Sequence, residues 1–80
     1  MDFSDLIALK INELMDEKNI SIYKLATLSG VYSSTISMFL ARSTKTIRLE
    51  NLYFLCDALN ISLSDFFADK RFLDAEPKEY

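Results

Sequence analysis

The chain has 80 residues, with nine Lys or Arg against twelve Asp or Glu, no His, and one residue each of Gly, Pro and Cys. This length is enough for one domain and too short for two, and so little Gly and Pro favours helices joined by short turns over a strand-rich fold. The lone cysteine excludes an internal disulfide, and no apolar run approaches the ~18 residues of a membrane span. The acidic start of the chain is unlike a secretory signal peptide, so we expect a cytoplasmic protein.

The sign of the charge changes twice along the chain. Residues 1–17 carry a net charge of −4, residues 18–49 carry +5 with no acidic residue, and residues 50–80 carry −4. The distribution matters more than the overall sum of −3 when a nucleic-acid partner is considered. The central basic segment is either a solvated face with no partner or a surface for an anionic polymer.

Apolar residues at three- and four-residue spacing predict a first helix from about Phe3 to Lys18. Asn19 is suited to end it, because Asn tolerates the left-handed backbone of a helix C-terminal cap. Ser21 is suited to cap a second helix from Ile22 to about Leu28. Gly30 then allows a sharp turn, since glycine takes a positive φ without strain.

A third helix is predicted from near Ser33 to near Ala41, and the residues from Arg42 to Thr46 form a polar, basic connection. The fourth helix covers about Leu49 to Leu59, and Asn60 is suited to end it. We expect its core stripe to consist of Leu49, Leu52, Leu55, Cys56 and Leu59.

Ser62 begins a sequence that resembles a capping box, which predicts a short fifth helix through Phe67. We place the domain at residues 1–69. Residues 70–80 are charged, and we expect them to form a loose or dimer-associated C-terminal tail. Tyr53, Phe54, Phe72 and Leu73 are candidates for a dimer surface, with completion of the small core as the alternative.

The stretch from Ser21 to Ala41 combines a capped helix of about two turns, a glycine turn and a second helix. Ala26 is small where the second helix crosses closely, Val31 fills the space beneath the turn, and Ile36 locks the later helix onto the earlier one. Together these features predict a helix-turn-helix, whose two helices meet at ~90–120°.

The sequence resembles the lambda-repressor and Cro-like, or XRE-type, helix-turn-helix regulators over about Leu6 to Phe67. The resemblance lies in the stretches 20–26, 29–31, 34–37, 47–52 and 56–67. It implies an all-α, compact five-helix domain that binds double-stranded DNA through its second and third helices, frequently as a homodimer. The sequence looks most like small regulators of Gram-positive bacteria, their phages and mobile elements.

Three positions depart from the family pattern. Arg42 stands where a Gly is frequent, which challenges the cap of the third helix. Ile47 replaces a common Pro. Tyr32 stands where Ser, Thr or Pro is usual, so either Ser33 caps the third helix or Tyr32 itself reaches the DNA.

In such a domain the third helix enters the major groove while the second crosses the backbone. The candidates for contact with base edges are Tyr32, Ser33, Ser34, Ser37 and Met38. None makes the bidentate base contacts that discriminate most strongly, so we expect DNA shape and paired half-sites to supply much of the specificity. The candidates for phosphate contacts are Ser21, Tyr23, Lys24, Thr35, Arg42, Ser43, Thr44, Lys45 and Arg48.

An enzyme is not expected, because the chain has no His, no phosphate-cradling glycine loop and no cluster of metal ligands. We accordingly expect no cofactor, metal or small-molecule ligand. The alternative function is a helix-turn-helix used for protein contact, in an adaptor, an antirepressor or the antitoxin half of a toxin–antitoxin pair. The overall acidity and the Ser-rich third helix favour this alternative, and the acid-free central segment favours DNA.

Overall fold

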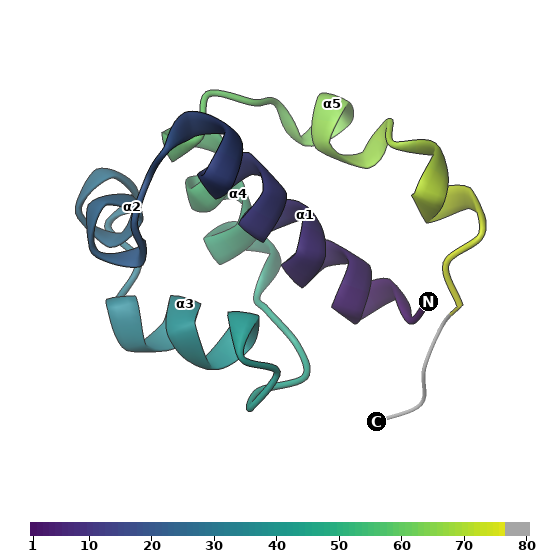
Figure 1. Ribbon diagram of the computed structural model, residues 1–80, viewed down its shortest axis with the longest axis horizontal. Coiled ribbons are helices and arrows are strands. Elements are labelled where there is room, and N and C mark those ends of the chain that lie inside the picture. The colour runs from purple at the N-terminus through teal and green to yellow at the C-terminus, as the bar shows by residue number, and fades with distance from the viewer. Residues whose placement is uncertain (77–80) are drawn as a thin grey trace.

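The computed structural model describes residues 1–76, and within that range the chain folds into helices without forming a strand. The expected five-helix, all-α fold is confirmed. In Figure 1, α1 lies across the middle of the bundle, with α2 and α3 on one side of it and α5 on the other. The helices are α1 (Phe3–Lys18), α2 (Ile22–Ser29), α3 (Ser33–Leu40), α4 (Leu49–Ala58), α5 (Leu63–Phe67) and a 3₁₀ helix, η1 (Lys70–Leu73).

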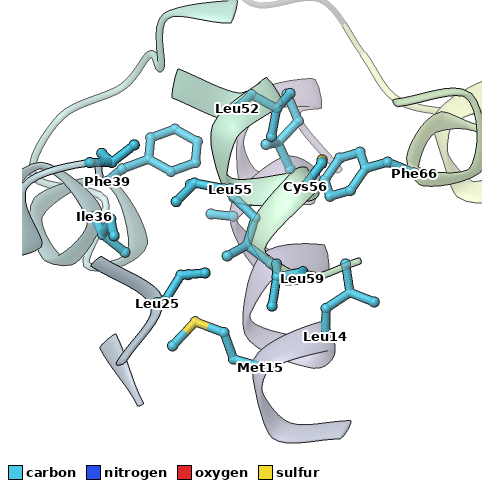
Figure 2. Close-up of a cluster of buried hydrophobic side chains, with 14 residues drawn as sticks. Leu14, Met15, Leu25, Ile36, Phe39, Leu52, Leu55, Cys56, Leu59 and Phe66 are labelled. Atoms are coloured by element: carbon cyan, nitrogen blue, oxygen red, sulfur yellow. The ribbon is translucent and has the colours of Figure 1, made fainter. Parts of the chain in front are cut away.

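The hydrophobic core gathers around the inner face of α4, where side chains from the other four α-helices meet (Figure 2). Leu25 of α2 is completely buried, and Ile36 and Phe39 attach α3 to the same cluster. Each such side chain contributes roughly 1.5–3 kcal/mol by leaving water. Cys56 is also buried, as its spacing predicts, and burial raises the pKa of its thiol to about 11. The core therefore holds α2 and α3 in fixed positions.

Leu49 does not belong to the core, contrary to our prediction. It is the first residue of α4 and is 69% exposed. Its side chain lines a surface hollow together with Tyr53 and Leu63. The apolar periodicity of α4 is correct from Leu52 onward, but the first turn of the helix lies at the surface of the bundle.

Three helices end in the same hydrogen-bond pattern, with a left-handed residue just after the helix. Asn19, Arg42 and Asn60 have φ angles of 54°, 62° and 59°. After each of them, the next amide donates to a carbonyl five residues back, at 2.8–2.9 Å. This is the Schellman arrangement that satisfies otherwise unpaired helix carbonyls. The predicted ends at Asn19 and Asn60 are confirmed, and Arg42 takes the same conformation without being Gly or Asn.

The helix starts are also largely as predicted. The Ser21 hydroxyl accepts a hydrogen bond from the Lys24 amide at 3.1 Å, and the Ser62 hydroxyl accepts one from the Asp65 amide at 3.0 Å. At α3, however, the N-cap is Tyr32, whose side chain makes no capping bond. The expectation that Ser33 caps this helix is wrong, because Ser33 is already its first helical residue.

The turn between α2 and α3 depends on Gly30. Its φ of 77° is in the left-handed region, and its amide donates to the Ala26 carbonyl at 2.9 Å. The Ser29 hydroxyl accepts a hydrogen bond from the Val31 amide at 3.1 Å, which also stabilises the turn. Val31 is buried beneath the turn, as its position in the sequence predicts.

The segment after Asp69, which we expected to be a loose or dimer-associated tail, packs on α1 through residue 76. Arg71 binds both carboxylate oxygens of Glu13, at 2.6 and 3.0 Å, and also binds Asp69 at 2.7 Å. Lys10 of α1 reaches the same Asp69 at 3.1 Å. These ion pairs connect residues far apart in the sequence, so local patterns did not reveal them. Residues 77–80 of the predicted tail lie outside the described residues.

An aromatic cluster and a backbone contact extend this attachment. The ring of Phe72 lies 4.9 Å from that of Phe67 and 5.7 Å from that of Phe3, between ring centroids. The Phe3 amide donates to the Glu76 carbonyl at 2.9 Å, which brings the last described residues beside the start of the chain (Figure 1). Phe72 therefore completes the core, the second of our two expectations for it, and is not part of a free dimer surface.

Acid should release η1 from α1. The hydrogen bonds with Arg71 hold the pKa of Glu13 below its ordinary value and that of Asp69 far below. Because these pKa values are lower in the folded state, the stabilisation is complete above about pH 4.5 and is lost as the pH falls further. The protection of the amides of residues 70–76 against hydrogen exchange, relative to their intrinsic rates at each pH, should therefore be lost in acid before that of α3.

The matched control is Arg71→Met, in which this segment should be weakly protected already at neutral pH and should lose little further protection in acid. Equal protection of the segment in both proteins at pH 7 would show that the ion pairs do not hold it.

Candidate nucleic-acid interface

The outer side of α3 is open to solvent. Tyr32 at its start is 82% exposed and Met38 is 47% exposed. Ser33 and Ser34 are exposed, whereas Ser37 is half-buried and donates to the Ser34 carbonyl at 3.2 Å. The five candidates for base-edge contacts thus occupy the start and outer side of one helix, whose inner side is fixed in the core.

A groove of about 520 Å³ runs between α3 and the chain that leads into α4. Tyr32, Thr35 and Met38 line it from α3, and Thr44 and Arg48 line it from the opposite side. The structure therefore brings five of the predicted site residues together, from two segments of the chain. Four of these five side chains can donate hydrogen bonds, three through a hydroxyl group and Arg48 through its guanidinium.

Two further polar residues line this groove and were not predicted, Thr46 and Asn51. Thr46 had been placed in the connection without a role. Asn51 was overlooked because it stands among apolar residues of α4, although its spacing from Arg48 could have identified it. It lies three residues after Arg48, which places both on the same side of the helix start.

The remaining phosphate candidates do not line the groove. Ser21, Tyr23 and Lys24 lie at the start of α2 and are exposed, Tyr23 by 78%. Ser43 and Lys45 are exposed in the connection after α3, where the Lys45 ammonium donates to the Arg42 carbonyl at 3.1 Å.

The Arg42 guanidinium, predicted to bind phosphate, is bound to the protein itself. Its Nε donates to Asp5 at 2.7 Å, and its Nη2 donates to the Ser4 hydroxyl at 2.7 Å. Its Nη1 donates to the Phe39 carbonyl at 3.0 Å, and the guanidinium lies 4.7 Å from the centre of the Phe39 ring. Ser4 is itself buried and donates to the Lys45 carbonyl. Arg42 thus ties the end of α3, and the connection that follows, to the start of α1.

These contacts explain how Arg42 occupies a position that favours glycine. A left-handed backbone costs a non-glycine residue roughly 1–2 kcal/mol. Hydrogen bonds in which one partner is charged are stronger than neutral ones. The guanidinium forms two of its bonds with α1 and one with the last turn of α3, so the side chain offsets the strain of its own backbone.

The central basic segment therefore presents less free positive charge than its sequence suggests. Arg42 pairs with Asp5, and Arg48 pairs with Glu50, an acidic residue just after the segment. Within residues 1–76, Lys18, Lys24 and Lys45 form no ion pair. The Arg48–Glu50 pair is exposed on both sides, and exposed pairs are weak enough for a phosphate to compete.

A family model for the Cro/C1-type HTH DNA-binding domain matches residues 10–70, a range that includes α2, α3 and the whole groove. No curated protein and no solved structure matches the chain. None of the helices within residues 1–76 is long and apolar enough to cross a membrane, and the same residues contain no group of three potential metal ligands.

A double-mutant cycle can measure how much the contact between Arg42 and Asp5 stabilises the fold. Arg42→Ala should lower the free energy of unfolding by about 1–2 kcal/mol, since it removes charge-assisted bonds and keeps the left-handed backbone. Arg42→Gly should cost about 1 kcal/mol less than Arg42→Ala, because glycine relieves the backbone strain.

Asp5→Asn combined with Arg42→Ala should then show a coupling of about 1 kcal/mol in urea unfolding. Strictly additive effects of the two substitutions would contradict the structural role of this pair.

Proposed function

The chain belongs to the Cro/C1-type helix-turn-helix DNA-binding domains, and on that premise we propose that it is a transcriptional repressor that binds an operator as a dimer. The observation that carries the proposal is the exposed outer side of α3, anchored from below by Ile36 and Phe39. In this type of domain such a helix inserts into the major groove. The groove between α3 and α4 then faces the adjoining DNA backbone.

Phosphate contacts are assigned to two groups of residues on either side of α3. Lys24, with the hydroxyls of Ser21 and Tyr23, binds the backbone at the start of α2, where the helix dipole favours an anion. Lys45 and Arg48 bind it on the other side, with the hydroxyl and amide groups that line the groove. Arg42 is left out of this set, because its guanidinium is held by Asp5 and Ser4.

Base contacts are assigned to Tyr32, Ser33, Ser34, Ser37 and Met38. Serine hydroxyls bond to several bases and methionine contacts only apolar groups such as the thymine methyl, so direct discrimination is modest. Tyr32, the N-cap of α3, is the largest of these side chains and is more exposed than Met38. Specificity that the side chains do not supply comes from DNA deformability and from two half-sites bound together.

The DNA contacts of Lys24 and Lys45 are testable by charge removal. With a duplex selected from random sequences, Lys24→Gln or Lys45→Gln should each weaken binding and reduce the slope of log affinity against log salt by about 0.9. The control is Lys70→Gln, an exposed lysine in η1 that forms no ion pair among the described residues.

Fluorescence anisotropy over a series of salt concentrations measures both quantities. If no duplex is enriched, the chain is a protein-contact module of the alternative kind described above. If the control loses as much affinity as the test variants, Lys24 and Lys45 are not the phosphate contacts.

Tyr32→Ala tests base contact separately from phosphate contact. If Tyr32 touches base edges, this variant should enrich a different set of duplexes from random sequence, with about 1 kcal/mol less discrimination at one position of each half-site. Lys24→Gln should weaken all sequences about equally. Enrichment of the same sequences with the same ranking by Tyr32→Ala would remove Tyr32 from the base contacts.

A further inference from the structure

The first turn of α1 is held by two segments that are far from it in the sequence. One is the C-terminal segment (residues 70–76), and the other is the connection between α3 and α4. Three successive residues make these contacts: Phe3 bonds to the C-terminal segment, and Ser4 and Asp5 bond to residues that follow α3. In space α1 separates the C-terminal segment from α3 (Figure 1), so this turn is where the two sets of contacts meet.

The C-terminal segment supplies an acceptor that the start of a helix lacks. The first amides of an α-helix have no carbonyl within the helix to which they can donate. The Phe3 amide donates instead to the Glu76 carbonyl at 2.9 Å, and the Glu76 amide donates to the Met1 carbonyl at 3.0 Å. The Phe72 ring packs edge-on against the Phe3 ring, with 5.7 Å between ring centroids. Release of this segment would therefore expose the Phe3 amide to water and let the first turn of α1 fray.

The same turn determines where the backbone of Lys45 lies. The buried Ser4 hydroxyl donates to the Lys45 carbonyl and accepts a hydrogen bond from Arg42 Nη2 at 2.7 Å. Asp5 accepts a hydrogen bond from Arg42 Nε, also at 2.7 Å. The Arg42 guanidinium reaches the Lys45 carbonyl as well, at 3.4 Å. Lys45 is itself exposed, so its main chain is anchored to α1 while its side chain lies at the surface.

We propose that the C-terminal segment is a positioning element for the phosphate contact of Lys45, and that it acts through the first turn of α1. Packed rings and hydrogen bonds join the two ends without a break, and the residues between them belong to one helical turn, so they move together. This role rests on the proposed function for its effect on DNA, whereas its effect on the connection does not involve DNA. Within residues 1–76, Lys24 lies on α2 and takes no part in these contacts, so it is the internal control.

Hydrogen exchange of the free chain tests the coupling without DNA. The Ser43 amide donates to the Met38 carbonyl at 2.8 Å, just after α3. The Ile20 amide makes the same kind of bond to the Met15 carbonyl at 2.9 Å, at the far end of α1. Phe72→Ala removes ring contacts of the C-terminal segment. It should lower the protection of Ser43 about fivefold and leave that of Ile20 unchanged.

Three further variants separate this coupling from a general loss of stability. Arg71→Met removes the ion pairs of the same segment with α1, so it should reproduce the effect of Phe72→Ala. Leu73→Ser changes an 85% exposed residue of η1 and should have no effect. In an Arg42→Gly background the guanidinium no longer ties the connection to α1, so Phe72→Ala should lower the protection of Ser43 much less.

The phosphate contact is tested with a duplex selected from random sequences. Phe72→Ala should weaken binding about threefold. Lys45→Gln should then cost less affinity in this variant than in the unmodified chain, because the lysine is no longer held in place. Lys24→Gln should weaken binding by the same factor in both proteins, since its position does not depend on α1.

Unchanged protection of Ser43 in both Phe72→Ala and Arg71→Met would overturn this positioning role, as would a loss of protection that is equally large at Ile20. Equal costs of Lys45→Gln in the variant and in the unmodified chain would also overturn it. If no duplex is enriched while Ser43 still loses protection, the proposed DNA-binding function fails and the coupling within the fold stands.

Discussion

The burial of Ile36 and Phe39 holds α3 against α1 and α4, and what the outer side of α3 can do depends on that contact. Leu25 occupies the same cluster from α2, so the two helices are fixed to a common core rather than only to each other. Densely packed interiors resist small displacements. The polar outer residues of α3 are thus held in a constant orientation. Short side chains reach a binding partner only if the helix that carries them is positioned accurately.

The sequence alone overstates how much positive charge of the central segment is free to bind a ligand. The acid-free segment contains two arginines, and each is paired with an acid from outside it: Arg42 with Asp5, and Arg48 with Glu50. The first pair is half-buried and supports the backbone at the end of α3, while the second is exposed. Positive charge thus serves the architecture at one position and stays available to a ligand at the other.

Local signals predicted most of the fold, and long-range contacts account for what they missed. Serine caps and left-handed asparagines marked the helix ends correctly, because a helix terminus is determined by the few residues beside it. The partners of Arg42 lie 37 and 38 residues away in the sequence, and those of Arg71 on α1 lie 58 residues away. Periodicity cannot reveal such pairs. It also placed Leu49 inside, since spacing does not show where a core ends.

The buried thiol of Cys56 has a consequence for observing the molecule at work. A thiol reacts with alkylating reagents as its thiolate, and both the enclosure of this sulfur and its raised pKa suppress that form. Modification in the native protein therefore requires transient separation of α4 from the helices around it. The alkylation rate of Cys56 therefore reports how often this opening occurs. Comparing that rate with and without a ligand would measure how far the ligand suppresses local opening of the domain.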